Sequence, residues 1–62
     1  MDAAAYCRAR ARQVRQLAET TLDDALRESL RAMARNYDEL AEDLDSGIEP
    51  VRHTELLPEQ VP

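Results

Sequence analysis

The chain has 62 residues, with 13 acidic side chains against 8 basic ones and a formal net charge of −5. A chain of this length forms one domain at most and buries only a small core. The single cysteine excludes an intrachain disulfide, and no apolar run approaches the roughly 20 residues that cross a bilayer. The free thiol and the lack of a signal-peptide pattern predict a reducing, cytoplasmic location.

The first predicted helix spans about residues 2–20. Cys7, Ala11, Val14 and Ala18 recur at steps of four, three and four residues, which places them on one face of a helix. Most side chains on this face are small. The helix can therefore approach a neighbour closely, but it buries little apolar area by itself.

The second predicted helix, about residues 23–45, carries the more regular pattern. It follows the turn TTLDD, in which Thr21 and Asp23 compete as the N-cap, and Gly47 supplies the helix stop. Its apolar stripe has the strict a/d spacing of three heptads. The stripe consists of Leu26, Leu30, Met33, Tyr37, Leu40 and Leu44.

The short connection makes the two helices antiparallel neighbours, so the sequence predicts an all-α hairpin over residues 1–48. Residues 49–62 contain three prolines and no period, which predicts an extended or disordered tail. A hairpin has one internal interface, so each stripe keeps an uncovered side. Pairing with a second copy into a four-helix bundle, a homodimer, is the expected remedy. The residues predicted to carry self-association are Val14, Leu17, Leu26, Leu30, Met33, Tyr37, Leu40 and Leu44.

Charge is unevenly distributed along the chain. Residues 1–18 hold four arginines and one aspartate, whereas residues 19–62 hold four arginines and twelve acidic residues. In the hairpin, Arg8, Arg12 and Arg15 of the first helix are predicted to lie beside Arg35, Arg31 and Glu28 in that order, which is a poor charge match within one chain. The acidic end of a second copy is expected to face them instead and to set the orientation of the dimer.

The arginines of the two helices also suggest a nucleic-acid interface. They would form a basic band across the middle of the hairpin, where phosphate groups could bind. No aromatic residue lies among them, so the alternative is a solvated surface tied by ion pairs within the second helix. The band comprises Arg8, Arg12, Arg15, Arg27, Arg31 and Arg35. The pairs expected in the alternative are Asp23–Arg27, Glu28–Arg31 and Arg35–Glu39.

Two segments, RARQVRQLAE (10–19) and DDALRESLRAMARNYDELAE (23–42), resemble a group of small uncharacterised two-helix proteins of alphaproteobacteria. The group has the pattern RAxxxRxLAE, an Asp-led turn, often with proline next where this chain has Asp24, and then LRxxLxxxAxxYxxLAE. The resemblance implies a bacterial helical hairpin and implies no activity. The matching residues are Arg10, Ala11, Arg15, Leu17, Ala18, Glu19, Asp23, Leu26, Arg27, Leu30, Ala34, Tyr37, Leu40, Ala41 and Glu42.

The sequence predicts no catalytic, cofactor-binding or metal site. His53 is solitary, and the serines have no histidine on the helices to activate them, so an enzyme is not expected. Cys7 is predicted to be a small buried apolar residue, with a redox role as the alternative. Arg10 points into the apolar stripe, where it either extends to solvent or meets an acidic residue of a partner chain.

The predicted function is non-enzymatic protein–protein interaction, by a small self-associating helical regulator or adaptor that needs no cofactor and no membrane. Two alternatives stay open. One is a nucleic-acid-binding hairpin dimer that uses the arginine band. The other is a hetero-oligomeric subunit that folds on the helices of a different protein.

Overall fold

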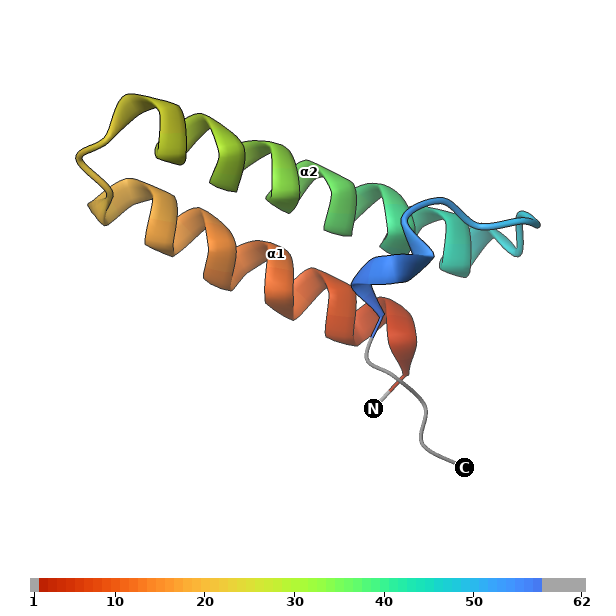
Figure 1. The fold of residues 1–62 in the computed structure, drawn as a ribbon. Coiled ribbons are helices and arrows are strands. Elements are labelled where there is room, and N and C mark those ends of the chain that lie inside the picture. The colour runs from red at the N-terminus through yellow and green to blue at the C-terminus, as the bar shows by residue number, and fades with distance from the viewer. Residues whose placement is uncertain (1, 58–62) are drawn as a thin grey trace.

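Two antiparallel helices and a short C-terminal segment make up the fold (Figure 1). The computed structural model describes residues 2–57. Helix α1 spans Ala3–Thr20, helix α2 spans Asp24–Ser46, and the 3-10 turn η1 spans Thr54–Leu56. α1 and α2 pack side by side, which confirms the predicted all-α hairpin. Neither helix in this part of the chain combines the length and the apolar character that crossing a membrane requires.

Side-chain hydrogen bonds fix where the two helices begin. Asp2 is the N-cap of α1, and its Oδ1 accepts a hydrogen bond from the backbone N–H of Ala5 at 2.8 Å. Asp23 caps α2 in the same way and accepts from the N–H of Leu26 at 3.0 Å. Each cap satisfies an N–H that has no partner inside the helix. Of the two candidates that the sequence offered for α2, Asp23 and not Thr21 is the cap.

α2 ends at Gly47, the position that the sequence predicts for the helix stop. Gly47 has a φ of 71°, and its N–H donates to the carbonyl of Asp43. The N–H of Ile48 donates to the same carbonyl at 3.2 Å. Glycine adopts this left-handed conformation without the cost that a side chain would bring. The chain therefore leaves the helix axis here and turns back toward the hairpin.

Small side chains line the contact between α1 and α2. Ala11 of α1 and Ala34 of α2 are fully buried, and Leu40 and Cys7 are the largest side chains that are fully buried. Alanines make up much of this contact, so the core holds little apolar volume. Its apolar residues are Ala4, Cys7, Ala11, Val14, Ala18, Ala34, Tyr37, Leu40 and Ala41.

The C-terminal segment folds back over the hairpin (Figure 1). Val51, Leu56 and Leu57 pack against the core, and the N–H of Leu56 donates to the carbonyl of His53 at 3.0 Å, which closes η1. Within the predicted tail, residues 49–62, the part from 51 to 57 therefore packs on the hairpin, because its apolar side chains gain burial there. Glu49 and Pro50 are exposed, and residues 58–62 lie outside the described residues.

Candidate functional site

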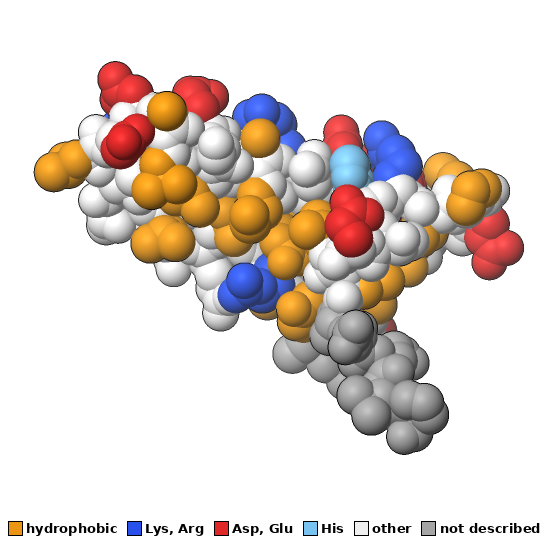
Figure 2. Space-filling model, in the orientation of Figure 1, with side chains coloured by type: hydrophobic (Ala, Val, Ile, Leu, Met, Phe, Trp, Pro, Cys, Tyr) orange, Lys and Arg blue, Asp and Glu red, His pale blue; other side chains and the backbone are white. Residues whose placement is uncertain are grey.

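Large apolar side chains are exposed where the two helices join. Leu22 in the turn is 94% exposed, and Leu17 and Leu26 on the adjoining helices are 56% and 52% exposed. Met33 is 39% exposed, and the half-buried Leu30 lies between it and Leu26 on the same helical stripe. Figure 2 shows hydrophobic side chains gathered on this face of the molecule. These five residues are called the turn-end patch below.

The structure divides the residues predicted for self-association into two groups. Those that belong to the turn-end patch are Leu17, Leu26, Leu30 and Met33. Those that pack into the core of the same chain are Val14, Tyr37, Leu40 and, in part, Leu44. The chain itself covers the side chains of the second group, and their part in self-association stays a prediction.

The sequence-based prediction omitted Leu22. It stands directly before the N-cap Asp23, in a turn where the apolar period is interrupted. An apolar residue at this position has no helix partner along the stripe, so the heptad pattern does not select it. The available signal was its apolar type between two polar neighbours, Thr21 and Asp23, in a connection too short to bury it.

Arg10 borders the turn-end patch on the side away from the turn. Its guanidinium carbon lies 5.9 Å from the centre of the Tyr37 ring, and its Nη1 donates to Oε1 of Gln13 at 2.7 Å. Tyr37 follows Met33 by about one turn of α2, so the charge stands at the edge of the exposed apolar side chains. Among the described residues, no carboxylate forms an ion pair with Arg10. Its contact with a partner's acidic residue stays a prediction.

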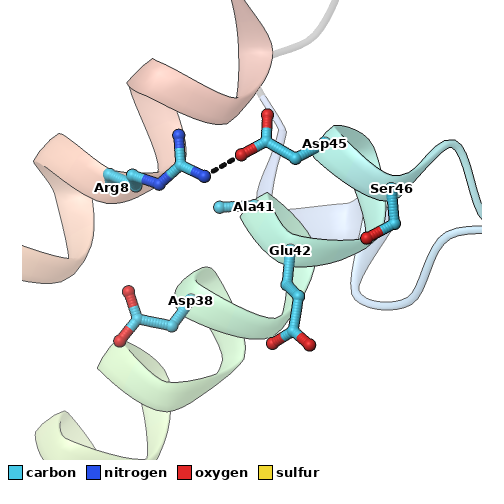
Figure 3. Close-up of a pocket in the computed structure, with 6 residues that line it drawn as sticks. All are labelled: Arg8, Asp38, Ala41, Glu42, Asp45 and Ser46. Atoms are coloured by element: carbon cyan, nitrogen blue, oxygen red, sulfur yellow. Dashed lines mark hydrogen bonds and ion pairs between the residues drawn. The ribbon is translucent and has the colours of Figure 1, made fainter.

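Ion pairs join the two helices on another face of the hairpin. Arg8 pairs with Asp45, as Figure 3 shows, and Arg15 pairs with Asp38. The expected poor charge match within the chain is therefore wrong for these two arginines. Side chains lean toward the N-terminus of their own helix, so the arginines of α1 reach toward the acidic end of α2. Arg12 is exposed and forms no ion pair with a described residue.

The arginines of α2 pair mainly with acidic residues one turn away. Nη1 of Arg31 lies 3.4 Å from Oε1 of Glu28, as the sequence predicts. Arg27 pairs with Asp24 and not with Asp23. The reason is that the carboxylate of Asp23 serves as the N-cap of α2. These pairs are exposed, and each contributes about 0–1 kcal/mol to stability.

Arginines of the band from both helices come together at one place. Arg15, Arg31 and Arg35 line a shallow hollow between the helices together with Glu19. The carboxylate of Glu19 and the ion pairs of Arg15 and Arg31 offset much of the positive charge there. The predicted pair between Arg35 and Glu39 is absent from the described part of the chain, because Glu39 contacts the C-terminal segment instead.

A buried carboxylate anchors the C-terminal segment on α2. Asp43 is 3% exposed and accepts three hydrogen bonds from Arg52, from the backbone N–H at 3.0 Å, Nε at 2.9 Å and Nη2 at 3.0 Å. Nε2 of His53 lies 2.8 Å from Oε1 of Glu39. These four residues are called the tail lock below. No pattern in the sequence indicates the tail lock, since its partners lie on α2 and beyond the helix stop.

The tail lock makes stability depend on pH. Hydrogen bonds from the side chain and backbone of Arg52 lower the pKa of Asp43 from 3.8 to about 2. Because the pKa is lower in the folded chain, the stabilisation is complete above about pH 4 and is lost as the pH falls toward about 2.

Asp43→Asn should therefore lower the thermal midpoint at neutral pH. The difference in thermal midpoint between this variant and the wild type should shrink as the pH falls from about 4 toward about 2, as measured in circular-dichroism melts. Asp45→Asn, at an exposed pair, is the control; a deficit that does not change with pH would contradict the assignment.

Cys7 is fully buried on α1, which confirms its prediction as a small buried residue. Burial raises the pKa of its thiol, so the thiol stays protonated and unreactive near neutral pH. His53 is not solitary in the structure, because it contacts Glu39. Within residues 2–57, however, no three His, Cys, Asp or Glu side chains gather in a group that could hold a metal ion.

Comparisons of the chain with protein-family models, with curated proteins and with solved structures gave no match. The resemblance to alphaproteobacterial two-helix proteins stays a prediction.

Proposed function

We propose that the protein is a non-enzymatic protein–protein interaction module that associates with a second copy through the turn-end patch. The observation that carries the proposal is the exposure of Leu17, Leu22 and Leu26, each more than half exposed, beside a core with few large side chains. Chains of this size usually need a further source of stability, and oligomerisation supplies one. Apolar area removed from water by a second copy contributes roughly 25 cal/mol per Å².

The charges at the two ends of the turn-end patch favour a second copy as the partner. Asp23 stands at the turn end, and Arg10 stands at the other end, over the ring of Tyr37. A twofold axis through the middle of the patch brings Asp23 of one copy toward Arg10 of the other, at two equivalent places. Such a dimer pairs an arginine that has no described carboxylate partner and places four helices together. A reducing cytoplasm, where the thiol of Cys7 persists, is the proposed location.

The direct test is the solution mass, measured by light scattering on a sizing column across a dilution series. The wild type is expected at about twice 7.0 kDa when concentrated, with helicity falling as the dimer dissociates. Leu26→Asp is expected to remain at the mass of one chain, because an unpaired carboxylate in an apolar interface is costly.

Ile48→Asp is the matched control for this test. Ile48 is 53% exposed, nearly the same as Leu26, but follows the end of α2 away from the turn-end patch. It adds the same charge and removes a similar apolar side chain, so dimerisation should persist. Equal masses for the two variants at every concentration would refute the patch as the interface.

The nucleic-acid interface and the subunit that folds on a different protein remain predictions, and each would give a different experimental result. Salt-sensitive RNA binding that is lost in an Arg12→Glu/Arg35→Glu variant would favour the nucleic-acid interface. The ion pairs of Arg8 and Arg15 leave that interface with less support, since their charges are already partly offset. A poorly helical single chain would favour a subunit that folds on a different protein.

A further inference from the structure

The end of the hairpin opposite the turn holds a second exposed apolar surface. An open hollow of about 690 Å³ lies there, between the end of α2 and the C-terminal segment. Its polar residues are Glu49 and Thr54, and its apolar residues are Leu44, Pro50 and Val51. This hollow is called the acidic hollow below, for the charge around it. It lies at the far end of α2 from the turn-end patch, so pairing through that patch leaves it uncovered.

The same end of the molecule carries the negative charge of the described chain. Residues 2–41 hold seven arginines and seven acidic residues, whereas residues 42–57 hold five acidic residues and one arginine. That arginine, Arg52, is already bound to Asp43 in the tail lock. Figure 2 shows acidic and hydrophobic side chains next to one another at this end. The acidic residues here that form no ion pair with a described residue are Glu42, Glu49 and Glu55.

We propose that the acidic hollow binds a basic segment of another protein, in which an apolar side chain is flanked by lysine or arginine. The apolar side chain would enter between Leu44, Pro50 and Val51 and remove their surface from water. The flanking cations would approach Glu49, which lines the hollow, and Glu55, which directly follows Thr54. Complementary charge of this kind speeds association and selects the partner. Nucleic acids and anionic lipids carry the wrong charge for this surface.

A labelled peptide in which two leucines are flanked by lysines is the probe, and fluorescence anisotropy measures its binding to the full chain. We expect binding that weakens as salt is added, because the charges at the rim are exposed. Two matched peptides separate the contributions of charge and apolar contact, one with glutamate in place of lysine and one with serine in place of leucine. Neither should bind measurably. Equal binding of either matched peptide would overturn the proposal.

Glu49→Lys tests the position of the site, because it reverses the one charge that lines the hollow. Glu28→Lys is the matched control, with the same change in net charge at an exposed residue near the other end of α2. Glu49→Lys should weaken binding of the lysine peptide about 3- to 10-fold, and Glu28→Lys by much less. Equal losses in the two variants would refute the site. If Glu49→Lys alters the circular-dichroism spectrum, the neutral pair Glu49→Gln and Glu28→Gln gives the same comparison with a smaller difference.

Amide chemical shifts locate the bound peptide directly. We expect changes at Val51 and Thr54 and none at Leu26, and changes confined to the turn-end patch would overturn the proposal. The site does not depend on self-association, so Leu26→Asp should bind the peptide as the wild type does. A wild-type chain that binds the peptide but stays single would refute the proposed dimer alone. A dimer that binds no peptide at low salt would refute the acidic hollow alone.

Discussion

Leu40→Ala is expected to lower the free energy of unfolding by about 2–5 kcal/mol. Leu40 is fully buried where α1, α2 and the C-terminal segment meet, and few other large side chains fill this core. Truncation removes its apolar burial and leaves a cavity that the neighbouring alanines are too small to fill. A chain of this length has a total stability of roughly 3–9 kcal/mol, so much of the population should unfold. Urea unfolding followed by circular dichroism, at a concentration where the chain is single, measures the change.

Leu26→Ala is the matched control for Leu40→Ala. The two positions share one heptad position and one residue type, but Leu26 is 52% exposed and Leu40 is fully buried. Leu26→Ala should lower the free energy of unfolding by less than about 1 kcal/mol under the same conditions, because only part of the Leu26 side chain is removed from water on folding. Similar losses for both variants would mean that the stripe is covered evenly. For the same reason a charge placed at Leu40 would report on folding and not on association.

Ala11→Leu is expected to destabilise the hairpin by about 1–3 kcal/mol or more. Ala11 and Ala34 are both fully buried, one on each helix, in the core between the two helices. A leucine at this contact must push the helices apart or adopt a strained rotamer, and separation would also loosen the packing of Leu40. The thermal midpoint and the urea midpoint should both fall while the mean residue helicity of the folded chain stays similar.

Ala25→Leu separates overpacking from the intrinsic effect of the substitution. Ala25 is exposed in the first turn of α2, and leucine has nearly the helix propensity of alanine. The control should therefore change stability by less than about 0.5 kcal/mol. If Ala11→Leu were equally mild, the helices would not be in contact through their alanines, and the hairpin packing described above would be wrong.

The proposed function follows from how unevenly the chain covers its apolar surface. Here the chain buries one part of its apolar stripe in a core against which the C-terminal segment packs, and it leaves the turn-end patch open. The first part gains stability within one chain. The second part is available to a partner, and the charges of Asp23 and Arg10 at its ends suit a twofold pair.

Local signals were sufficient to predict the hairpin. Asp2 and Asp23 cap the helices by bonding to N–H groups three residues away, and Gly47 ends α2 because it tolerates a positive φ. The heptad stripe of α2 places its apolar residues on one side whatever packs on them. These features depend on neighbours within one helical turn, so the sequence by itself determined the helices, their approximate ends and their antiparallel order.

Only the tertiary structure decided what covers the stripe. Leu26, Met33 and Leu40 are equivalent in the sequence pattern, but only Leu40 lies in the buried core, against which a segment that returns from beyond Gly47 also packs. The contact of Asp43 with Arg52 likewise joins residues that no helical period relates. The long side chains of Arg8 and Arg15 reach the acidic end of α2 and form ion pairs there that the sequence pattern did not predict. Such contacts depend on where the chain folds back on itself, which a one-dimensional pattern of apolar and charged residues does not specify.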